Sequence, residues 1–382
     1  MFEQEYKTLL ALVAPLCGGQ KTEVKVAPES YPTLCRLAKH HSVANLLYLA
    51  CQDDPALPPA LRTALEGLLF SSVQQQLQQE YEAGRVFAAL EEAGVRFLPM
   101  KGVVLRPLYP KPEMRISCDV DIFYDKEARP RVRELMAALG FTPNGTDANH
   151  DDFKKGNVSV EMHHNLMSHF PTVDAYYRDV WERLIPVNAC RYRMRDEDFY
   201  IHMTVHTMKH FAVGGTGIRS VLDVFVFLHA KPALDMAYIE AELEKLGLLT
   251  FHRSMVALAN AYCGTAPLPP ELREVSDYIL GSGTYGVFSQ SVANTAAAGR
   301  GGKLGFYFRR AFPAYRLMVE KYPSLRRFPP ALPAYWVYRL GAAAFGKGHQ
   351  LHREVQTLNA VDRATQKRLD NVMAQVGLRA YR

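Results

Sequence analysis

The chain has 382 residues, of which 48% are hydrophobic and 22% are charged, and its formal net charge is +6. This composition is typical of a folded globular protein and favours it over a disordered chain, while the length suggests two or three domains. The mild positive charge permits a polyanionic partner without requiring one.

The cysteines and the apolar segments indicate the expected cellular location of the protein. Its six cysteines are scattered and contain no Cys-x-x-Cys pair, so they do not indicate a disulfide framework, and a reducing cytoplasm fits best. The first residues carry acids and no basic region, which is not the pattern of a signal peptide. The apolar run at 329–346 is interrupted by prolines and Arg339, so we expect no membrane span.

Residues 1–93 are expected to form an N-terminal helical region, because their apolar residues recur near every 3.6 positions. The segment 31–52 predicts a helical hairpin. The segment 61–93 predicts one long helix, and Gly94 is well suited to end it because glycine readily adopts the backbone conformation that closes a helix.

The apolar period then changes and predicts a small α/β core over residues 94–190. Residues 95–100 predict a short apolar strand, and the turn and short helix that follow it end at Pro110. Residues 117–124 and 157–166 predict a second and a third strand, with a helix between them.

Alternation along the second and third strands places three carboxylates on polar faces. Asp119 and Asp121 face away from Val120 and Ile122, and Glu161 lies on the polar face of the third strand. Like charges raise one another's pKa, so such a cluster is unstable without cations. Mg²⁺ prefers oxygen ligands and keeps positions free for substrate phosphates. The alternative is a solvated strand end, which is the common setting of an Asp-x-Asp pair.

Candidate phosphate ligands lie beside these acids. Lys101 and Gly102 occupy the turn between the first strand and the short helix, where an ammonium group and backbone N–H groups can receive phosphate. Arg115 adds a forked donor that suits phosphate oxygens. Taken one at a time, Gly102 is also explained as a turn glycine and Lys101 as a solvated lysine.

Residues 191–382 are expected to form a C-terminal helical domain. Segments 197–211 and 219–230 predict successive buried helices joined by a loop, and later helices are interrupted by a glycine-rich segment at 298–305 and a proline-rich segment at 322–336. The predicted fold class is therefore α+β, with a small mixed-sheet core flanked by N-terminal and C-terminal helical regions.

The order of strand, Lys-Gly turn, helix and Arg-x-Ser-x-Asp-x-Asp strand resembles the nucleotidyltransferase superfamily of the DNA polymerase β type. More closely, MKGVVLRPLYPKPEMRISCDVDIFYDKE followed by VSVEMHHNL is similar to an uncharacterised bacterial nucleotidyltransferase family. The flanking segments LAKHHSVANLLYL, RSVLDVFVFL and KYPSLRRFPPALPAYWVYR occur in the matching order, as does a His-x-x-x-His pair at His206 and His210. The resemblance covers most of the chain and implies a nucleotidyltransferase core at 94–190.

The chain departs from the wider superfamily at two places. Lys101-Gly102 stands where the superfamily has a Gly-Ser pair, so the hydroxyl that usually touches phosphate is missing and Lys101 is expected to replace it. Glu161 stands where relatives commonly have Asp, and the extra methylene moves the carboxylate by roughly 1.5 Å, one bond length.

The resemblance implies that Asp119 and Asp121 hold Mg²⁺ or Mn²⁺ together with the nucleotide phosphates. It implies that Glu161 joins the second metal and takes the proton of an acceptor hydroxyl. These three are the expected catalytic and metal-binding residues. The reaction would be attack of the hydroxyl on the α-phosphorus of an NTP with release of pyrophosphate. The expected nucleotide-binding residues are Lys101, Gly102, Arg115, His163, Lys209 and Asp223.

Several of the outlying residues have simpler interpretations. His206 and His210 share one helix face, but no third ligand is evident, so buried or nucleotide-facing histidines are favoured over a Zn²⁺ site. Lys209 fits a solvated lysine as well as a phosphate ligand. Arg219 and Asp223 are four residues apart, which predicts an ion pair within one helix.

The segment 300–353 carries eleven Lys and Arg residues, one Glu and several interleaved aromatic residues. Such a segment can bind an RNA backbone and stack on bases. The alternative is a helical domain whose cations extend over an aromatic core, and no RNA-binding motif accompanies the charge.

The sequence therefore predicts a metal-dependent nucleotidyltransferase that acts on an NTP and a small hydroxylated acceptor. Two alternatives remain at this stage. One is a toxin-type transferase that modifies tRNA or a protein, and the other is a nucleotide-binding relative without turnover. No motif in the sequence names the acceptor or the preferred nucleotide.

Overall fold

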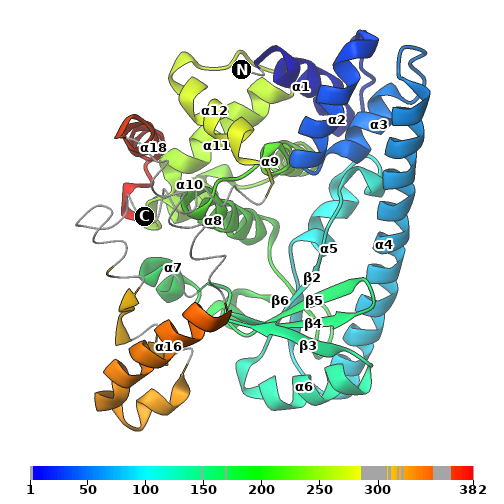
Figure 1. The fold of residues 1–382 in the computed structure, drawn as a ribbon. Coiled ribbons are helices and arrows are strands. Elements are labelled where there is room, and N and C mark those ends of the chain that lie inside the picture. Colours follow the sequence, from blue (N-terminus) through cyan, green and yellow to red (C-terminus); the bar gives the residue numbers. More distant parts are fainter. Residues whose placement is uncertain are drawn as a thin grey trace.

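A five-stranded mixed sheet occupies the middle of the chain, and helices precede and follow it (Figure 1). This arrangement confirms the predicted α+β class. The structure is a computed structural model, and it describes residues 3–147, 149–167, 170–284, 308, 311–315, 318–319, 322–346 and 363–381.

The N-terminal helices pack into a bundle that also receives one helix of the C-terminal domain. The predicted hairpin is confirmed as two short helices, and the predicted long helix is confirmed with 34 residues. The far half of this long helix leaves the bundle and packs on the sheet through Ala83, Val86 and Leu90. The helices are α1 (Glu3–Cys17), α2 (Tyr31–His40), α3 (Ala44–Cys51) and α4 (Pro59–Glu92).

The sheet has the order β1-β2-β5-β4-β3, and the pairing of β2 with β5 is parallel while its other pairings are antiparallel. A short helix, α5 (Gly102–Leu105), follows β1, and α6 (Arg129–Ala138) follows β2 and covers one face of the sheet (Figure 1). The strands are β1 (Phe97–Pro99), β2 (Val120–Tyr124), β3 (Thr142–Thr146), β4 (His150–Lys155) and β5 (Val158–His163).

The two faces of the sheet separate apolar from polar side chains, as the alternation predicted. Val120 and Ile122 of β2 join Val160 and Met162 of β5 in a buried core against α4 and α6. Asp121 pairs with Glu161 in the parallel register, so both carboxylates lie on the opposite face. Burial of the apolar face therefore fixes the register that brings the acids together.

Strands β3 and β4 were not predicted from the sequence. All five residues of β3 are exposed, and it contains Pro143 and Gly145, which are unfavourable in strands. Strand β4 reads HDDFKK and has one apolar side chain, Phe153. These strands form because β5 offers a free edge for pairing, which is a tertiary cause that leaves no apolar alternation in the sequence.

The two predicted buried helices of the C-terminal region are confirmed and lie over the polar side of the sheet (Figure 1). A two-stranded ribbon, β6 (Ile185–Pro186) and β7 (Tyr192–Arg193), precedes these two helices and extends beyond the expected boundary at 190. No helix among the described residues is long and apolar enough to cross a membrane. The helices are α7 (Pro171–Tyr176), α8 (Asp196–Val213), α9 (Ile218–Ala230), α10 (Met236–Lys245), α11 (Leu249–Tyr262), α12 (Arg273–Ser282), α16 (Leu332–Gly346) and α18 (Arg363–Gln375).

A buried ion pair joins the core to the C-terminal helices. Arg115 Nε donates to Asp223 Oδ1 at 2.8 Å and its Nη2 donates to Asp223 Oδ2 at 3.1 Å. Tyr109 Oη donates to the same carboxylate at 2.8 Å. All three side chains are buried, and burial opposes the charge of Arg115 while Asp223 raises the pKa of its guanidinium. The sequence predicted a pair within α9, whereas this pair spans 108 positions of the chain.

Replacing Asp223 should destabilise the fold, because Asp223→Ala leaves Arg115 as a buried charge without its main partner. We expect the free energy of unfolding to fall by about 3–5 kcal/mol. The matched control is Asp277→Ala, which removes the acid of a pair with Arg368 whose side chains are 59% and 54% exposed. That loss should stay within about 1 kcal/mol. Urea melts of both variants measure the difference, and equal midpoints would contradict a stabilising role for the buried pair.

Candidate active site

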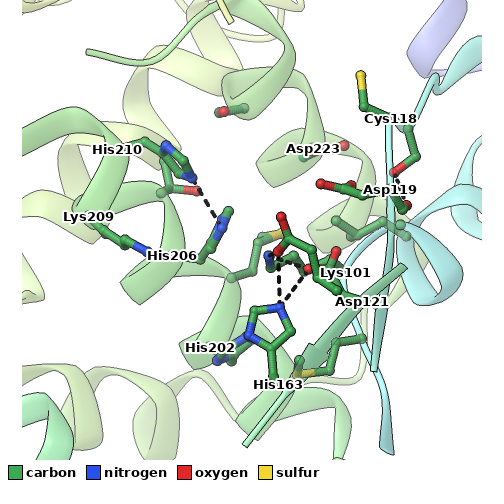
Figure 2. Close-up of a pocket in the computed structure, with 18 of the residues that line it drawn as sticks. Lys101, Cys118, Asp119, Asp121, His163, His202, His206, Lys209, His210 and Asp223 are labelled. Carbon is green, nitrogen blue, oxygen red and sulfur yellow. Dashed lines mark hydrogen bonds and ion pairs between the residues drawn. The ribbon is translucent and has the colours of Figure 1, made fainter. Parts of the chain in front are cut away.

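A cavity of about 370 Å³ lies between the polar face of the sheet, the turn before α5, and helices α8 and α9 (Figure 2). Its volume is within the range of small-molecule sites. The cavity brings together every site residue that the sequence suggested. These are Lys101, Gly102, Arg115, Asp119, Asp121, Glu161, His163, Lys209 and Asp223.

The three acids converge in this cavity. One ligand oxygen each from Asp119, Asp121 and Glu161 can be chosen so that all three lie within 4.8 Å of one another. Asp121 is 1% exposed, whereas Asp119 and Glu161 are partly exposed to the cavity. The donor set contains only carboxylate oxygens, which are the ligands that Mg²⁺ and Mn²⁺ prefer, so these residues fit a hard divalent cation.

Lys101 neutralises part of the acidic charge. Its Nζ lies 2.5 Å from Asp121 Oδ1 and 3.9 Å from Glu161 Oε2. Burial alone would lower the pKa of Lys101, but the nearby carboxylates outweigh burial and raise it. Burial alone would likewise raise the pKa of Asp121, but Lys101 and His163 outweigh it and lower that pKa. Both groups are therefore charged at neutral pH.

The turn that presents Lys101 is strained. Lys101 has φ +46° and ψ −110°, and Val103 N donates to Met100 O at 3.2 Å, which closes a tight turn with Lys101 at a position that normally takes glycine. Gly102 follows because a Cβ there would lie 2.5 Å from Ser117 Oγ. Strain of this kind is commonly kept where a side chain has a function.

His163 binds both acids from the end of β5. Its Nε2 lies 3.0 Å from Asp121 Oδ1 and 3.2 Å from Glu161 Oε2 (Figure 2). Burial opposes the charged imidazolium, but the two carboxylates prevail and raise the pKa of His163. Lys101 and His163 therefore both contact the acids of this site.

The surroundings of Asp119 disfavour its charged form. Burial raises its pKa, the charge of Asp121 raises it further, and together they bring it to about 6. The strand that begins at the next residue, β2, is buried along its whole length.

Helix α8 supplies a wall of imidazoles opposite the acids. His202, His206 and His210 recur every fourth residue and line the cavity together with Lys209 (Figure 2). Burial lowers the pKa of His202 to about 3 and that of His210 to about 4, and it also lowers the pKa of His206 and of Lys209. The imidazoles are therefore neutral at pH 7 and offer hydrogen bonds without charge.

Two histidines of this cavity, His150 and His202, were not identified by the sequence analysis. His202 is 3% exposed, and the signal that could have revealed it is its four-residue spacing from His206. His150 belongs to β4, which the sequence did not predict. His206 Nε2 lies 3.1 Å from His210 Nε2, and neither residue belongs to a group of metal-ligating side chains within the described ranges.

Arg115 and Asp223 line the cavity, and two hydrogen bonds join their side chains. Arg115 Nη1 is buried and has no hydrogen-bond partner within the described residues, so one donor remains for a ligand. Arg219 Nη1 donates to Ile116 O at 3.1 Å and holds α9 against the segment that leads into β2. Nucleotide binding by Arg115, Lys209 and Asp223 stays a prediction.

Replacing Asp119 or Asp121 with Asn should have opposite effects on the melting temperature in metal-free buffer. A carboxyl whose pKa is raised by folding destabilises the folded protein once it is ionised. For Asp119 this destabilisation is fully present above about pH 6 and absent below about pH 4. Asp119→Asn should therefore melt at the same or a higher temperature than wild type at pH 8. Asp121→Asn should melt lower, because Lys101 and His163 lose their shared partner.

Adding Mg²⁺ to the same samples should raise the melting temperature of the wild type by mass action and raise that of either variant much less. Thermal melts at pH 8 and pH 4, in EDTA and in Mg²⁺, measure both effects. Equal destabilisation by the two substitutions would show that the acids form one structural unit.

Comparison with known proteins assigns the chain to a family. The model of a family described as uncharacterised nucleotidyltransferase matches residues 28–264, which is more than half of the chain. No curated protein and no solved structure matches significantly. The matched range includes α2 to α11 and therefore the sheet, the strained turn, the acids and the histidine wall. The chain belongs to this uncharacterised nucleotidyltransferase family.

Proposed function

We propose that the protein transfers a nucleoside monophosphate from an NTP to a hydroxyl of a small-molecule acceptor, with Mg²⁺ or Mn²⁺ as cofactor. Family membership supports nucleotidyl transfer in general. The observation that carries the finer proposal is the convergence of Asp119, Asp121 and Glu161 beside Lys101 in one cavity.

The three acids and Lys101 each have a role in this proposal. Asp119 and Asp121 hold the cations, and Glu161 supplies a third carboxylate. When bound there, divalent cations neutralise phosphate oxygens and stabilise the attacking and leaving oxygens of the displacement. Glu161, which is partly exposed to the cavity, accepts the proton of the acceptor hydroxyl at a carboxylate oxygen. Lys101, whose ammonium lies beside Asp121 and Glu161, would supply a positive charge to the phosphates.

The walls of the cavity favour a small acceptor. Neutral imidazoles of His202, His206 and His210 can orient polar groups of a nucleotide or acceptor without adding charge. The cavity volume of about 370 Å³ is that of a site for small molecules. Most cations of the basic segment 300–353 lie outside the described residues, so RNA as acceptor is an outcome of the experiment below.

The direct test incubates the protein with each α-³²P-labelled NTP, Mg²⁺ and a panel of hydroxylated small molecules, total tRNA and the protein itself. Label on a small molecule supports the proposal. Label on tRNA or protein would establish the toxin-type alternative, and label on none, with NTP still bound, would indicate a binding protein without turnover.

Nucleotide affinity should depend on a divalent cation and on Lys101. Calorimetry with a non-hydrolysable ATP analogue should show binding with Mg²⁺ and little without it. Lys101→Ala should weaken this binding by about 10-fold or more, as expected for loss of a charge-assisted contact, and Lys209→Ala should weaken it less.

The same substitution separates two roles of Lys101. Because Lys101 competes with the cation for Asp121, Lys101→Ala should keep or raise the affinity for Mg²⁺ alone while it lowers the affinity for nucleotide. A parallel loss of both affinities would mean that Lys101 only maintains the structure of the site. Nucleotide binding of equal strength in EDTA would contradict the role given to the aspartates.

A further inference from the structure

His150, Glu161 and His163 form a second group of potential metal ligands beside the three carboxylates. Their ligand atoms all lie within 4.8 Å of one another. His150 Nε2 is 3.7 Å from Glu161 Oε1, and His163 Nε2 is 3.2 Å from Glu161 Oε2. Ligands of a zinc-type ion lie about 2.0–2.1 Å from it and hence roughly 3–4 Å from each other. Both contacts fall in this range, one through each oxygen of the Glu161 carboxylate.

The sheet holds this group in place. Strand β4 pairs antiparallel with β5, and the register sets His150 directly opposite His163. The two imidazole rings are 4.8 Å apart between centroids. Glu161 is two residues before His163 on the same face of β5, so all three side chains are carried by two hydrogen-bonded strands and line the same cavity.

Asp147 orients His150 toward the group. Asp147 Oδ1 accepts hydrogen bonds from the backbone N–H groups of Asn149 and His150, and it lies 3.3 Å from His150 Nδ1. This contact leaves the other ring nitrogen, Nε2, directed toward Glu161 Oε1 at 3.7 Å. An imidazole nitrogen and a carboxylate oxygen at this separation can share a cation. A carboxylate behind a histidine is a common support of metal ligands.

The polar contacts of His163 are made by Nε2 and lie in the cavity. The residue is 6% exposed, its Nε2 contacts Asp121 and Glu161, and its Nδ1 is buried without a hydrogen-bond partner among the described residues. Within the described residues, the hydrogen bonds of this ring are therefore those to the two acids.

We propose that His150, Glu161 and His163 hold a borderline divalent cation of the zinc type, and that Glu161 bridges it to the hard-cation site of Asp119 and Asp121. Imidazole ligands suit Zn²⁺ and Co²⁺, whereas the all-carboxylate group suits Mg²⁺, so the two neighbouring sites differ in the ion that they select. Three protein ligands leave a position open for water or a phosphate oxygen. A role of this cation in nucleotidyl transfer rests on the proposed function, whereas binding of the cation does not.

Co²⁺ is the probe, because it replaces Zn²⁺ and its visible absorption reports nitrogen ligands. The metal-stripped full chain is titrated with CoCl₂ in excess Mg²⁺, without nucleotide, and followed by absorption and calorimetry. We expect one Co²⁺ per chain that Mg²⁺ does not displace. His150→Ala should weaken it by more than about 100-fold, and Asp147→Asn, which keeps the turn, by about 10–100-fold. His229→Ala, at an exposed histidine of α9, is the matched control and should bind as wild type.

Displacement of all Co²⁺ by Mg²⁺, or equal Co²⁺ affinity in wild type and His150→Ala, would overturn the proposal. Circular dichroism establishes that each variant is folded, and if His150→Ala is not, Asp147→Asn decides. Asp119→Asn separates this proposal from the preceding one. It should lose Mg²⁺-dependent nucleotide binding and keep the Co²⁺ site, whereas normal Mg²⁺-dependent nucleotide binding by Asp119→Asn would contradict the proposed function and leave the Co²⁺ result standing.

Discussion

The parallel pairing of β2 with β5 is the constraint on which the rest of the site depends. It sets Asp121 beside Glu161 and places both on the face away from α4 and α6. Two carboxylates in this position repel each other. Lys101, in the turn before α5, and His163, on the same strand as Glu161, both contact Asp121 and offset this repulsion. A slip of one residue would exchange these acids with apolar side chains of the core, so the hydrophobic effect and the charge arrangement require the same register.

Lys101 connects the electrostatics of the site to its backbone geometry. The residue occupies a positive-φ position in a tight turn, and its ammonium is held by a buried carboxylate. Met100 N also donates to Asp121 O, so the turn and the strand are fixed to each other. The ammonium has three N–H donors, so in our proposal it can neutralise the acids and contact a phosphate from the same position.

The C-terminal helices complete the cavity rather than merely adjoining the sheet. Their attachment includes the buried contacts of Asp223 with Arg115 and Tyr109, and it places α8 across from the acids. The side of the cavity formed by the sheet carries the acids and Lys101, whereas α8 carries imidazoles that burial keeps neutral. In our proposal the charged side binds cations and phosphates, and the imidazoles of α8 recognise the ligand through hydrogen bonds.

The sequence by itself determined the helical regions, the apolar faces of β2 and β5, and the polar face that carries Asp119, Asp121 and Glu161, because periodic burial leaves a periodic pattern in the residues. It did not reveal β3 and β4, whose residues are mostly polar and which form by pairing with the edge of β5. The position of His150, the counter-charge role of Lys101 and the pairing of Arg115 with Asp223 were decided by tertiary structure alone. Each depends on which segments meet in space, and contacts between distant residues leave no local period from which they can be deduced.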